Sequence, residues 1–295
     1  MKGRTVSERF FVERPVDGKH AVLTGPEAHH LAHVMRGRPG DRVTLFDGTG
    51  VEFSAEVAVV RRDQVELRVL ERRYVDRELG FPLTLAVALP KGQRQHWLVE
   101  KAVELGATQF VPLLCDRSVA KPTEHSLDRL RRVVIEASKQ CGRNRLMEIA
   151  PPQQCRQFCQ SAESAALRVM SHPQPHPEQP RAARPAVPQL AADLSEPSPH
   201  IGPAESRNTQ QTEPVTPSSV GAGCLPARHP ETYRVHGFIL AVGPEGGFTE
   251  DEVAVARHSG WQIVGLGSRT LRVETACVML VCWALTAAGA ALRFH

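Results

Sequence analysis

The stretch Gly243-Pro-Glu-Gly-Gly-Phe-Thr249 follows a short apolar segment, residues 238–242, and precedes a helix with complete start signals. Three glycines in five residues allow positive φ values and a close approach of the main chain to a bound group. Thr249 is the expected N-cap, and Glu252 three residues later completes a capping box. The pattern predicts a strand, a tight turn and a helix, which is the repeating unit of an α/β fold.

A second stretch, Leu266-Gly-Ser-Arg-Thr-Leu-Arg-Val-Glu-Thr-Ala276, repeats this plan between a predicted strand at 262–266 and an apolar helix at 273–288. Ligands in open α/β sheets bind at the carboxyl ends of strands, where both turns lie. Neither turn has the lysine of a Walker A loop or the spacing of a dinucleotide fingerprint. Either motif alone is compatible with an ordinary tight turn. Together, with Arg272 and Glu274 at the second turn, they predict a site for a small ligand.

The rest of the chain divides into two patterns. Up to about residue 75, apolar residues alternate with polar ones, which predicts the half-buried strands of a small barrel, with one short helix at 26–36. From residue 82 onward strands alternate with helices, which predicts a mainly parallel sheet with helices on both faces. In this half we expect strands at 83–89, 109–115, 167–171 and 238–242, and helices at 93–105, 127–139 and 158–166. The inner side of the first of these helices is expected to carry Trp97, Leu98, Ala102 and Leu105.

These motifs resemble those of the SPOUT RNA methyltransferases, in detail the branch that methylates N3 of a uridine in 16S-type ribosomal RNA. The resemblance covers about residues 4–171 and 235–288. Besides the two turns it rests on Arg9-Phe-Phe-Val12, His30-Leu-Ala-His-Val-Met-Arg36, Gly40-Asp41, Leu45-Phe-Asp-Gly48, Leu89-Pro-Lys91, Glu100-Lys101, Glu104-Leu-Gly106, Glu136-Ala-Ser-Lys-Gln140 and Gly142-Arg143. It implies an α/β, trefoil-knotted, mainly parallel sheet at 77–171 and 233–295, preceded by a PUA-like β-barrel domain at 1–76.

The same resemblance implies S-adenosyl-L-methionine as cofactor, small-subunit ribosomal RNA or the assembled small subunit as partner, and a homodimer. The cofactor-binding residues it implies are Gly243, Glu245, Gly246, Gly247, Leu266, Gly267, Leu271 and Ala276. Arg9, Arg36, Lys91 and Arg143 are the implied RNA-binding residues.

For catalysis we expect Arg272 to stabilise charge on the uracil oxygens, because a guanidinium stays cationic and donates two hydrogen bonds at once. The alternative is a structural arginine at the helix start, paired with Glu274 or Glu245. Glu274 is the second candidate catalytic residue, since a carboxylate of raised pKa accepts a proton, and each glutamate has the alternative of capping backbone amides. No residue is a clear general base.

The formal net charge is +4, and the charged residues are distributed unevenly along the chain. Residues 121–145 alone hold seven Lys or Arg against three acids. This segment is either a phosphate-contacting surface or an ordinary solvated helix. Seven cysteines without a C-x-x-C pair predict free thiols and no metal site. We also expect a cytoplasmic protein with no membrane span and no signal peptide.

Residues 172–232 differ from both patterns, because they hold thirteen of the twenty-three prolines and no aromatic Phe, Trp or Tyr. Such a composition predicts a disordered insertion, either a tolerated surface excursion or a partner-binding element. A non-catalytic RNA-binding or ribosome-assembly protein, and a methyltransferase with another RNA target, remain the alternative functions.

Overall fold

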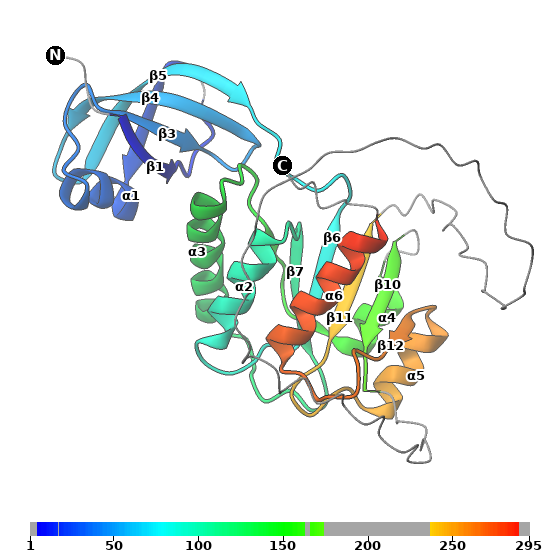
Figure 1. The fold of residues 1–295 in the computed structure, drawn as a ribbon. Coiled ribbons are helices and arrows are strands. Elements are labelled where there is room, and N and C mark those ends of the chain that lie inside the picture. The colour runs from blue at the N-terminus through cyan, green and yellow to red at the C-terminus, as the bar shows by residue number, and fades with distance from the viewer. Residues whose placement is uncertain (1–4, 17, 163–165, 174–236, 289–295) are drawn as a thin grey trace, which may run out of the picture. The chain divides into compact units, whose positions relative to one another are not determined.

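The computed structural model describes residues 5–16, 18–162, 166–173 and 237–288 (Figure 1). Apart from its first two residues, the proline-rich segment predicted to be disordered lies outside the described residues. Among the described residues, no helix combines the length and the apolar character that a membrane crossing requires.

The N-terminal sheet is curled and mixed, with the strand order β1-β3-β4-β5-β2. Its first pair, β1 with β3, is parallel and the other pairs are antiparallel. Alternate side chains of β4 and β5 point into one apolar core, as the period of two in the sequence predicts. The strands are β1 (Thr5–Phe11), β2 (His20–Thr24), β3 (Arg42–Phe46), β4 (Val51–Val60) and β5 (Gln64–Tyr74).

The short helix predicted at 26–36 is present but changes its winding. It starts as α1 (Gly25–His29) and continues as the π-helical turn η1 (His30–Val34). The backbone N–H of Met35 donates to the carbonyl of His30 at 2.9 Å, five residues back, which is the π-helical bond.

The C-terminal sheet is parallel throughout, with the strand order β12-β10-β11-β6-β7-β8 and β9 paired with β7. This confirms the parallel sheet that the alternating pattern predicts. Its strands are β6 (Leu83–Val87), β7 (Gln109–Leu114), β8 (Glu148–Ile149), β9 (Gln153–Gln154), β10 (Leu167–Ser171), β11 (Phe238–Val242) and β12 (Gln262–Val264).

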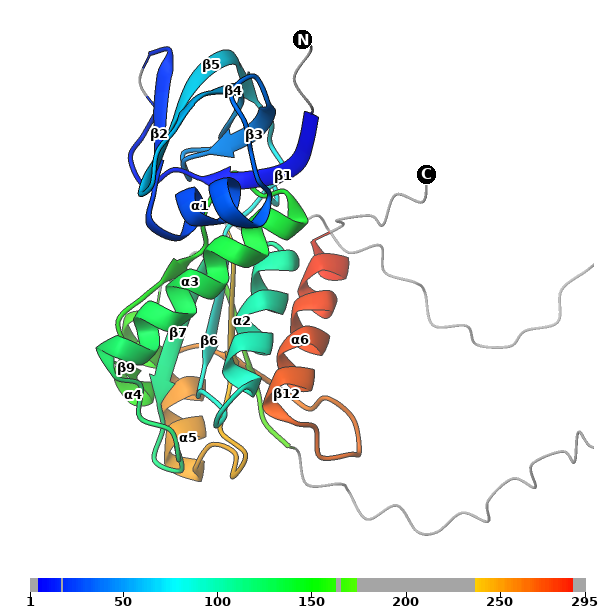
Figure 2. The same cartoon turned by 90° about the vertical axis from the view of Figure 1, so that its left-hand side faces the viewer.

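Helices cover both faces of this sheet, as Figure 2 shows. One face packs against α2 (Arg94–Glu104), α3 (Glu124–Cys141) and α6 (Val273–Ala287). The other packs against α4 (Cys155–Ser161) and α5 (Glu250–His258). Strand β6 shows why both faces are apolar: Leu85 and Val87 belong to the first core and Ala86 to the second.

Two details of the helix prediction are wrong. Trp97 is 43% exposed, because the buried stripe of α2 is Leu98, Val99, Ala102 and Val103, and Trp97 lies just outside it. Helix α4 begins at Cys155 rather than at Phe158 and ends at Ser161, because Cys155, Phe158 and Cys159 form one apolar stripe of helical spacing.

Candidate functional site

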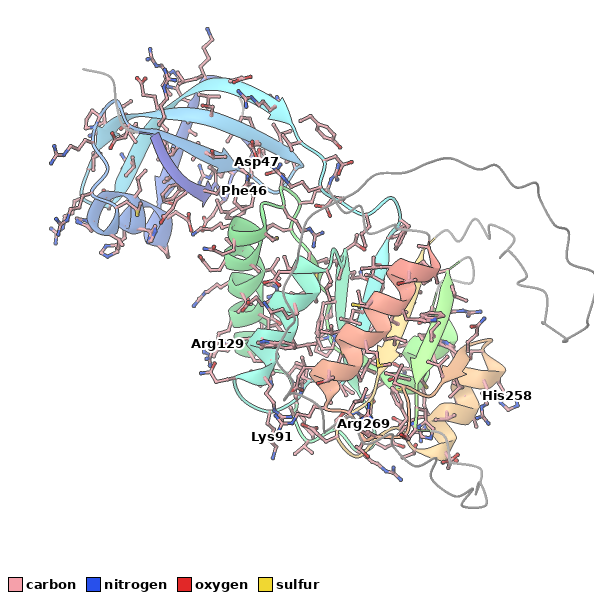
Figure 3. The ribbon with its side chains drawn as sticks, in the orientation of Figure 1. Phe46, Asp47, Lys91, Arg129, His258 and Arg269 are labelled. Atoms are coloured by element: carbon pink, nitrogen blue, oxygen red, sulfur yellow. The ribbon has the colours of Figure 1, made fainter. Side chains whose placement is uncertain are left out.

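The carboxyl ends of four parallel strands meet at one edge of the C-terminal sheet. In the strand register, Val242 lies beside Val87 on one side and beside Ser171 on the other, and Ser171 lies beside Val264. The two glycine turns and the segment after β6 therefore share this edge. Lys91 and Arg269, which follow β6 and β12, both lie at this end of the sheet (Figure 3).

The first turn, residues 243–249, is fixed by several main-chain contacts. The N–H of Gly247 donates to the carbonyl of Pro244 at 2.8 Å, and Gly247 has φ 70°, the left-handed region. A Cβ on Gly243 would meet the Phe248 ring at 3.0 Å, so any larger residue there would push against this ring. Arg117 donates from Nη1 to the carbonyl of Gly246 at 2.8 Å and thereby joins the turn to the end of β7.

The capping box at the start of α5 is confirmed. The backbone N–H of Thr249 donates to Glu252 Oε2 at 2.8 Å, and the N–H of Glu252 donates to Thr249 Oγ1 at 3.3 Å. The other carboxylate oxygen of Glu252 accepts a hydrogen bond from the N–H of Asp116 at 2.9 Å. The Glu252 side chain is only 1% exposed. One carboxylate thus holds the helix start and the loop after β7 together.

The second turn, residues 265–272, is more open. Leu266 and Leu271 pack in part against the core, while Gly267 between them is exposed with φ 98°. The carbonyl of Arg272 accepts the N–H of Ala276 at 2.9 Å, which places Arg272 at the N-cap of α6 and Ala276 in its first turns.

The Arg272 side chain is exposed, and within the described ranges its guanidinium has no recorded ion pair or hydrogen bond. The pairing with Glu274 or Glu245 that we considered for Arg272 is made by Arg94 instead. Arg94 donates from Nη2 to Glu245 Oε1 at 2.8 Å, and its Nη1 lies 3.8 Å from Glu274 Oε2.

Arg94 is a functional candidate that the sequence analysis missed. It is the first residue of α2 and lies three residues after Lys91, at the edge where β6 ends. The sequence contained one signal for this residue, its position at the start of a helix that follows β6. A helix that begins at this edge brings its first side chains to the two turns. Glu274 is buried, and its Oε2 has no hydrogen-bond partner among the described residues, so this atom is free to accept a bond from a ligand.

The structure corrects the expectation that Arg143 contacts RNA. Arg143 is 4% exposed, and its Nη1 donates to the carbonyls of Val103 and Ala107, at 2.9 Å each. Its other nitrogens bind the carboxylate of Glu78. Because its donors are used inside the protein, Arg143 fixes the loop after α3 and offers no group to a nucleic acid.

Arg9 is also used internally. Its Nη1 binds Glu52 Oε2 at 2.6 Å, its Nη2 donates to Asn144, and its guanidinium lies over the Phe46 ring at 5.1 Å. Burial alone would raise the pKa of Glu52, but the hydrogen bond and charge of Arg9, with a contribution from Arg77, lower it below its ordinary value. Arg9 therefore stabilises the contact of the curled sheet with the loop after α3.

The other predicted RNA-binding residues are exposed. Lys91 lies beside Arg94 at the edge with the turns, and Arg36 is the one described non-glycine residue with positive φ, at 54°. On α3, Arg131 and Lys139 are held by acidic neighbours. Arg129 and Arg132 line a groove of about 560 Å³, and three glutamates, Glu100, Glu104 and Glu136, line the same groove. Arg129 and Arg132 are thus exposed cations of this segment, but they share their groove with carboxylates.

Comparisons with known proteins agree with this architecture. The RNA methyltransferase domain family matches residues 77–194 and 225–285, and the RNA methyltransferase PUA domain matches residues 23–70. The fold and its two turns therefore define an RNA methyltransferase of the SPOUT class, with a PUA-like N-terminal domain.

Individual relatives narrow the class. The chain is 32% identical over 255 residues to ribosomal RNA small subunit methyltransferase E of Synechocystis, which covers 86% of this chain and 69% of the relative. It is 28% identical over 280 residues to the enzyme of the same name from Bacillus subtilis, with 91% and 92% covered. The chain belongs to the ribosomal RNA small subunit methyltransferase E family.

A solved structure also matches over nearly the full length. It is a ribosomal RNA small subunit methyltransferase E from Neisseria gonorrhoeae bound to S-adenosyl methionine, 26% identical, with a TM-score of 0.69. The match covers 95% of this chain and 98% of that one.

Proposed function

We propose that this protein transfers the methyl group of S-adenosyl-L-methionine to N3 of one uridine in small-subunit ribosomal RNA. The observation that carries the proposal is the meeting of two glycine turns at one sheet edge, in a chain of this family, with the Arg272 guanidinium exposed beside them. The finer assignments, to N3 and to named residues, rest on the motifs and on the chemistry below.

The residues of the two turns fit the cofactor. Added Cβ atoms at Gly247 and Gly267 would meet nothing within 4 Å, so main-chain groups are open to a ligand at both turns. Glu274 Oε2, which makes no hydrogen bond among the described residues, offers a buried acceptor at the same edge. We assign cofactor binding to main-chain groups of Gly243, Glu245, Gly246, Gly247, Leu266, Gly267 and Leu271 and to the surface of Ala276.

When bound, S-adenosyl-L-methionine supplies an electrophilic methyl group. The uracil imide is a weak acid, so its N3 must lose a proton before or during attack. Arg272 lies free to donate two hydrogen bonds to a uracil oxygen and so to stabilise the anion. Glu274, buried and without a hydrogen bond at Oε2, is the group placed to accept the N3 proton.

Arg94 acts as the positioning residue of this site. Its single guanidinium holds Glu245 of the first turn and lies beside Glu274 of the second. Because like-charged carboxylates repel, the cation between them sets the spacing of the two turns.

RNA binding is assigned to Arg36, Lys91, Arg129 and Arg132, which are exposed cations on the curled sheet's helix, the site edge and α3. A polyanion binds such a surface with strong salt dependence, because counterions are released. Arg143 and Arg9 are assigned a structural role.

We further propose a homodimer, a trefoil knot and a cytoplasmic location. Trp97 on α2 and Met279 and Trp283 on α6 are large exposed apolar side chains on adjacent helices, which favours a partner on that face.

The chain leaves β12 at the sheet edge and returns as α6, packed on β11 and α2, so residues 265–272 cross the ends of β10 and β11. Crossovers of this kind also occur in unknotted α/β folds, so the proposal of a knot rests on the resemblance of the motifs.

The test is methylation of small subunits from a strain that lacks this gene. Purified protein and isotopically labelled cofactor are added, and the RNA nucleosides are separated by mass spectrometry. The expected result is one labelled N3-methyluridine. Label in another base or in a ribose would redirect the proposal to a different RNA target, and cofactor binding without transfer would favour a non-catalytic assembly factor.

A further inference from the structure

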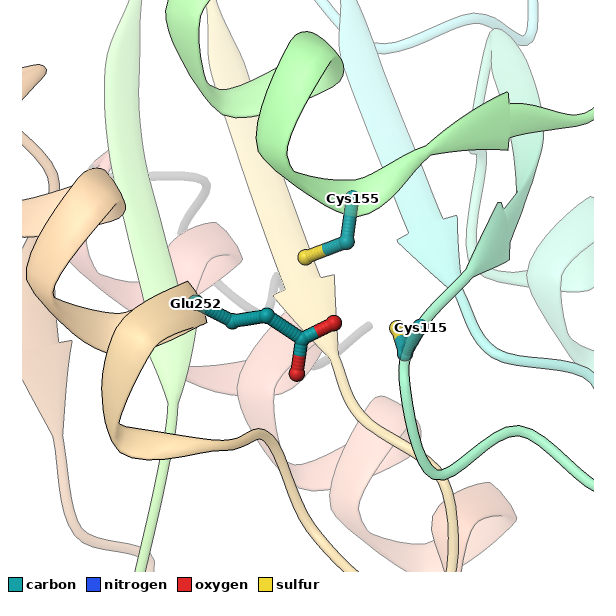
Figure 4. A group of neighbouring side chains, drawn as sticks. All are labelled: Cys115, Cys155 and Glu252. Carbon is teal, nitrogen blue, oxygen red and sulfur yellow. The ribbon is translucent and has the colours of Figure 1, made fainter.

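Behind the first glycine turn, three parts of the chain bring two thiols and a carboxylate together (Figure 4). Cys115 follows β7, Cys155 is the first residue of α4, and Glu252 lies in the first turn of α5. All three are buried, and their ligand atoms lie within 4.8 Å of one another. The sequence showed none of this, because the three residues are far apart in the chain.

A third buried thiol lies on the same helix as Cys155. This thiol belongs to Cys159, one helical turn after Cys155. The hydrogen bond with Cys115 and burial raise the pKa of Cys155, and the hydrogen bond with Cys155 and burial raise the pKa of Cys159.

The geometry points to a binding site for a thiophilic divalent cation of the zinc type, formed by Cys115 Sγ, Cys155 Sγ and a carboxylate oxygen of Glu252. Three atoms no more than 4.8 Å apart have a common centre within about 2.8 Å of each. Zinc needs bonds of about 2.3 Å to sulfur and about 2.0 Å to a carboxylate oxygen. Each ligand has to move by less than about 1 Å.

The charge and proton balance are straightforward. Binding breaks the S–H bonds of Cys115 and Cys155, releases two protons to solvent and forms two metal–sulfur bonds, without oxidation or reduction. Two thiolates and one carboxylate around a divalent cation leave one negative charge. The amide dipoles at the start of α5, where Glu252 is held, offset part of it.

Glu252 Oε1 has a lone pair available for a bond to the metal ion. Its Oε1 accepts one hydrogen bond, from the N–H of Asp116, whereas Oε2 accepts from Thr249. A metal on Oε1 would therefore join the end of β7 and the start of α4 to the helix that follows the first glycine turn. The site is a structural clamp and takes no part in methyl transfer.

The test uses the full chain, stripped with a chelator and kept reduced with a phosphine. Cd²⁺ is added as a probe because its thiolate complexes absorb in the near ultraviolet, and Zn²⁺ uptake is measured by elemental analysis after desalting. We expect one ion per chain, two protons released and a higher Tm with Zn²⁺. A wild-type chain that takes up no ion would overturn the inference.

Variants identify the ligands. Cys155→Ala and, as a second variant, Cys115→Ser should fold with a cooperative transition, abolish the cadmium–thiolate absorption and lose the rise in Tm. The matched control is the double variant Cys224→Ser/Cys282→Ser, which removes the thiol outside the described residues and the exposed thiol of α6. Uptake lost in this control, or kept in both cluster variants, would place the ion elsewhere.

Discussion

The two glycine turns lie at one edge of one sheet but are built differently. The first, residues 243–249, is held by Arg117, by Arg94 through Glu245 and by the capping box of Thr249 and Glu252. In the second, most residues from 265 to 272 are exposed, and only its two leucines pack on the core. From this difference we expect the first turn to be formed in advance and the second to become fixed when ligand binds.

The largest effect is expected from Arg272→Ala in the second turn. Loss of one preorganised donor to a developing oxyanion costs roughly 100- to 1,000-fold in turnover. The fold should be unchanged, because within the described residues this guanidinium has no recorded partner. The labelled-methyl assay measures the rate, and a circular dichroism melt checks the fold.

Arg269→Ala is the matched control, because Arg269 is an exposed arginine of the same turn. It should keep nearly full turnover. Equal rates for the two variants would remove Arg272 from the mechanism.

Next in size is Arg94→Gln, which removes the cation shared by the turns. An exposed ion pair of this kind contributes about 0.2 to 1 kcal/mol, so cofactor affinity should fall by up to about 5-fold. Titration calorimetry with S-adenosyl-L-methionine measures the Kd. Arg131→Gln, which breaks ion pairs with exposed acids on α3, should leave the Kd unchanged. Unaltered affinity in Arg94→Gln would mean that the turns need no common cation.

A smaller effect is expected on the free energy of unfolding, which should respond differently to substitutions in the two turns. Thr249→Ala deletes an N-cap and should lower the free energy of unfolding by about 1 kcal/mol. Thr270→Ala, in the exposed second turn, should change it by less than about 0.5 kcal/mol. Urea denaturation measures both, and equal losses would contradict the contrast between a fixed and an open turn.

The smallest difference concerns the two left-handed glycines. Gly247→Ala and Gly267→Ala both place a Cβ in open space at positive φ, at 70° and 98°, so only backbone strain is at issue. In the fixed first turn the strain should cost about 1 kcal/mol. In the second turn the backbone can relax, so the loss should be smaller, and a larger loss there would reverse our assignment of the turns.

Local signals in the sequence were enough for much of the fold. Thr249 and Glu252 predicted their own capping box, and the apolar runs 167–171 and 238–242 became strands with those bounds. These features depend on neighbours in the chain, so a single sequence reports them. The exposed position of Trp97 was missed because one helical stripe fits several registers.

Partners from distant parts of the chain were beyond the sequence. Arg143 looked like a surface cation, yet the fold brings it to Glu78 and to two carbonyls. Arg94 reaches Glu245, 151 residues away, and the thiols of Cys115 and Cys155 meet beside Glu252. Such contacts are set by strand order and register, which no local pattern encodes.

Hydrogen exchange with mass spectrometry, with and without S-adenosyl-L-methionine, tests the central claim most directly. If both turns bind the cofactor and the second becomes fixed on binding, peptides spanning 243–249 and 265–272 gain protection, the second more than the first. Protection at some other edge of the sheet, with both of these peptides unchanged, would contradict the account.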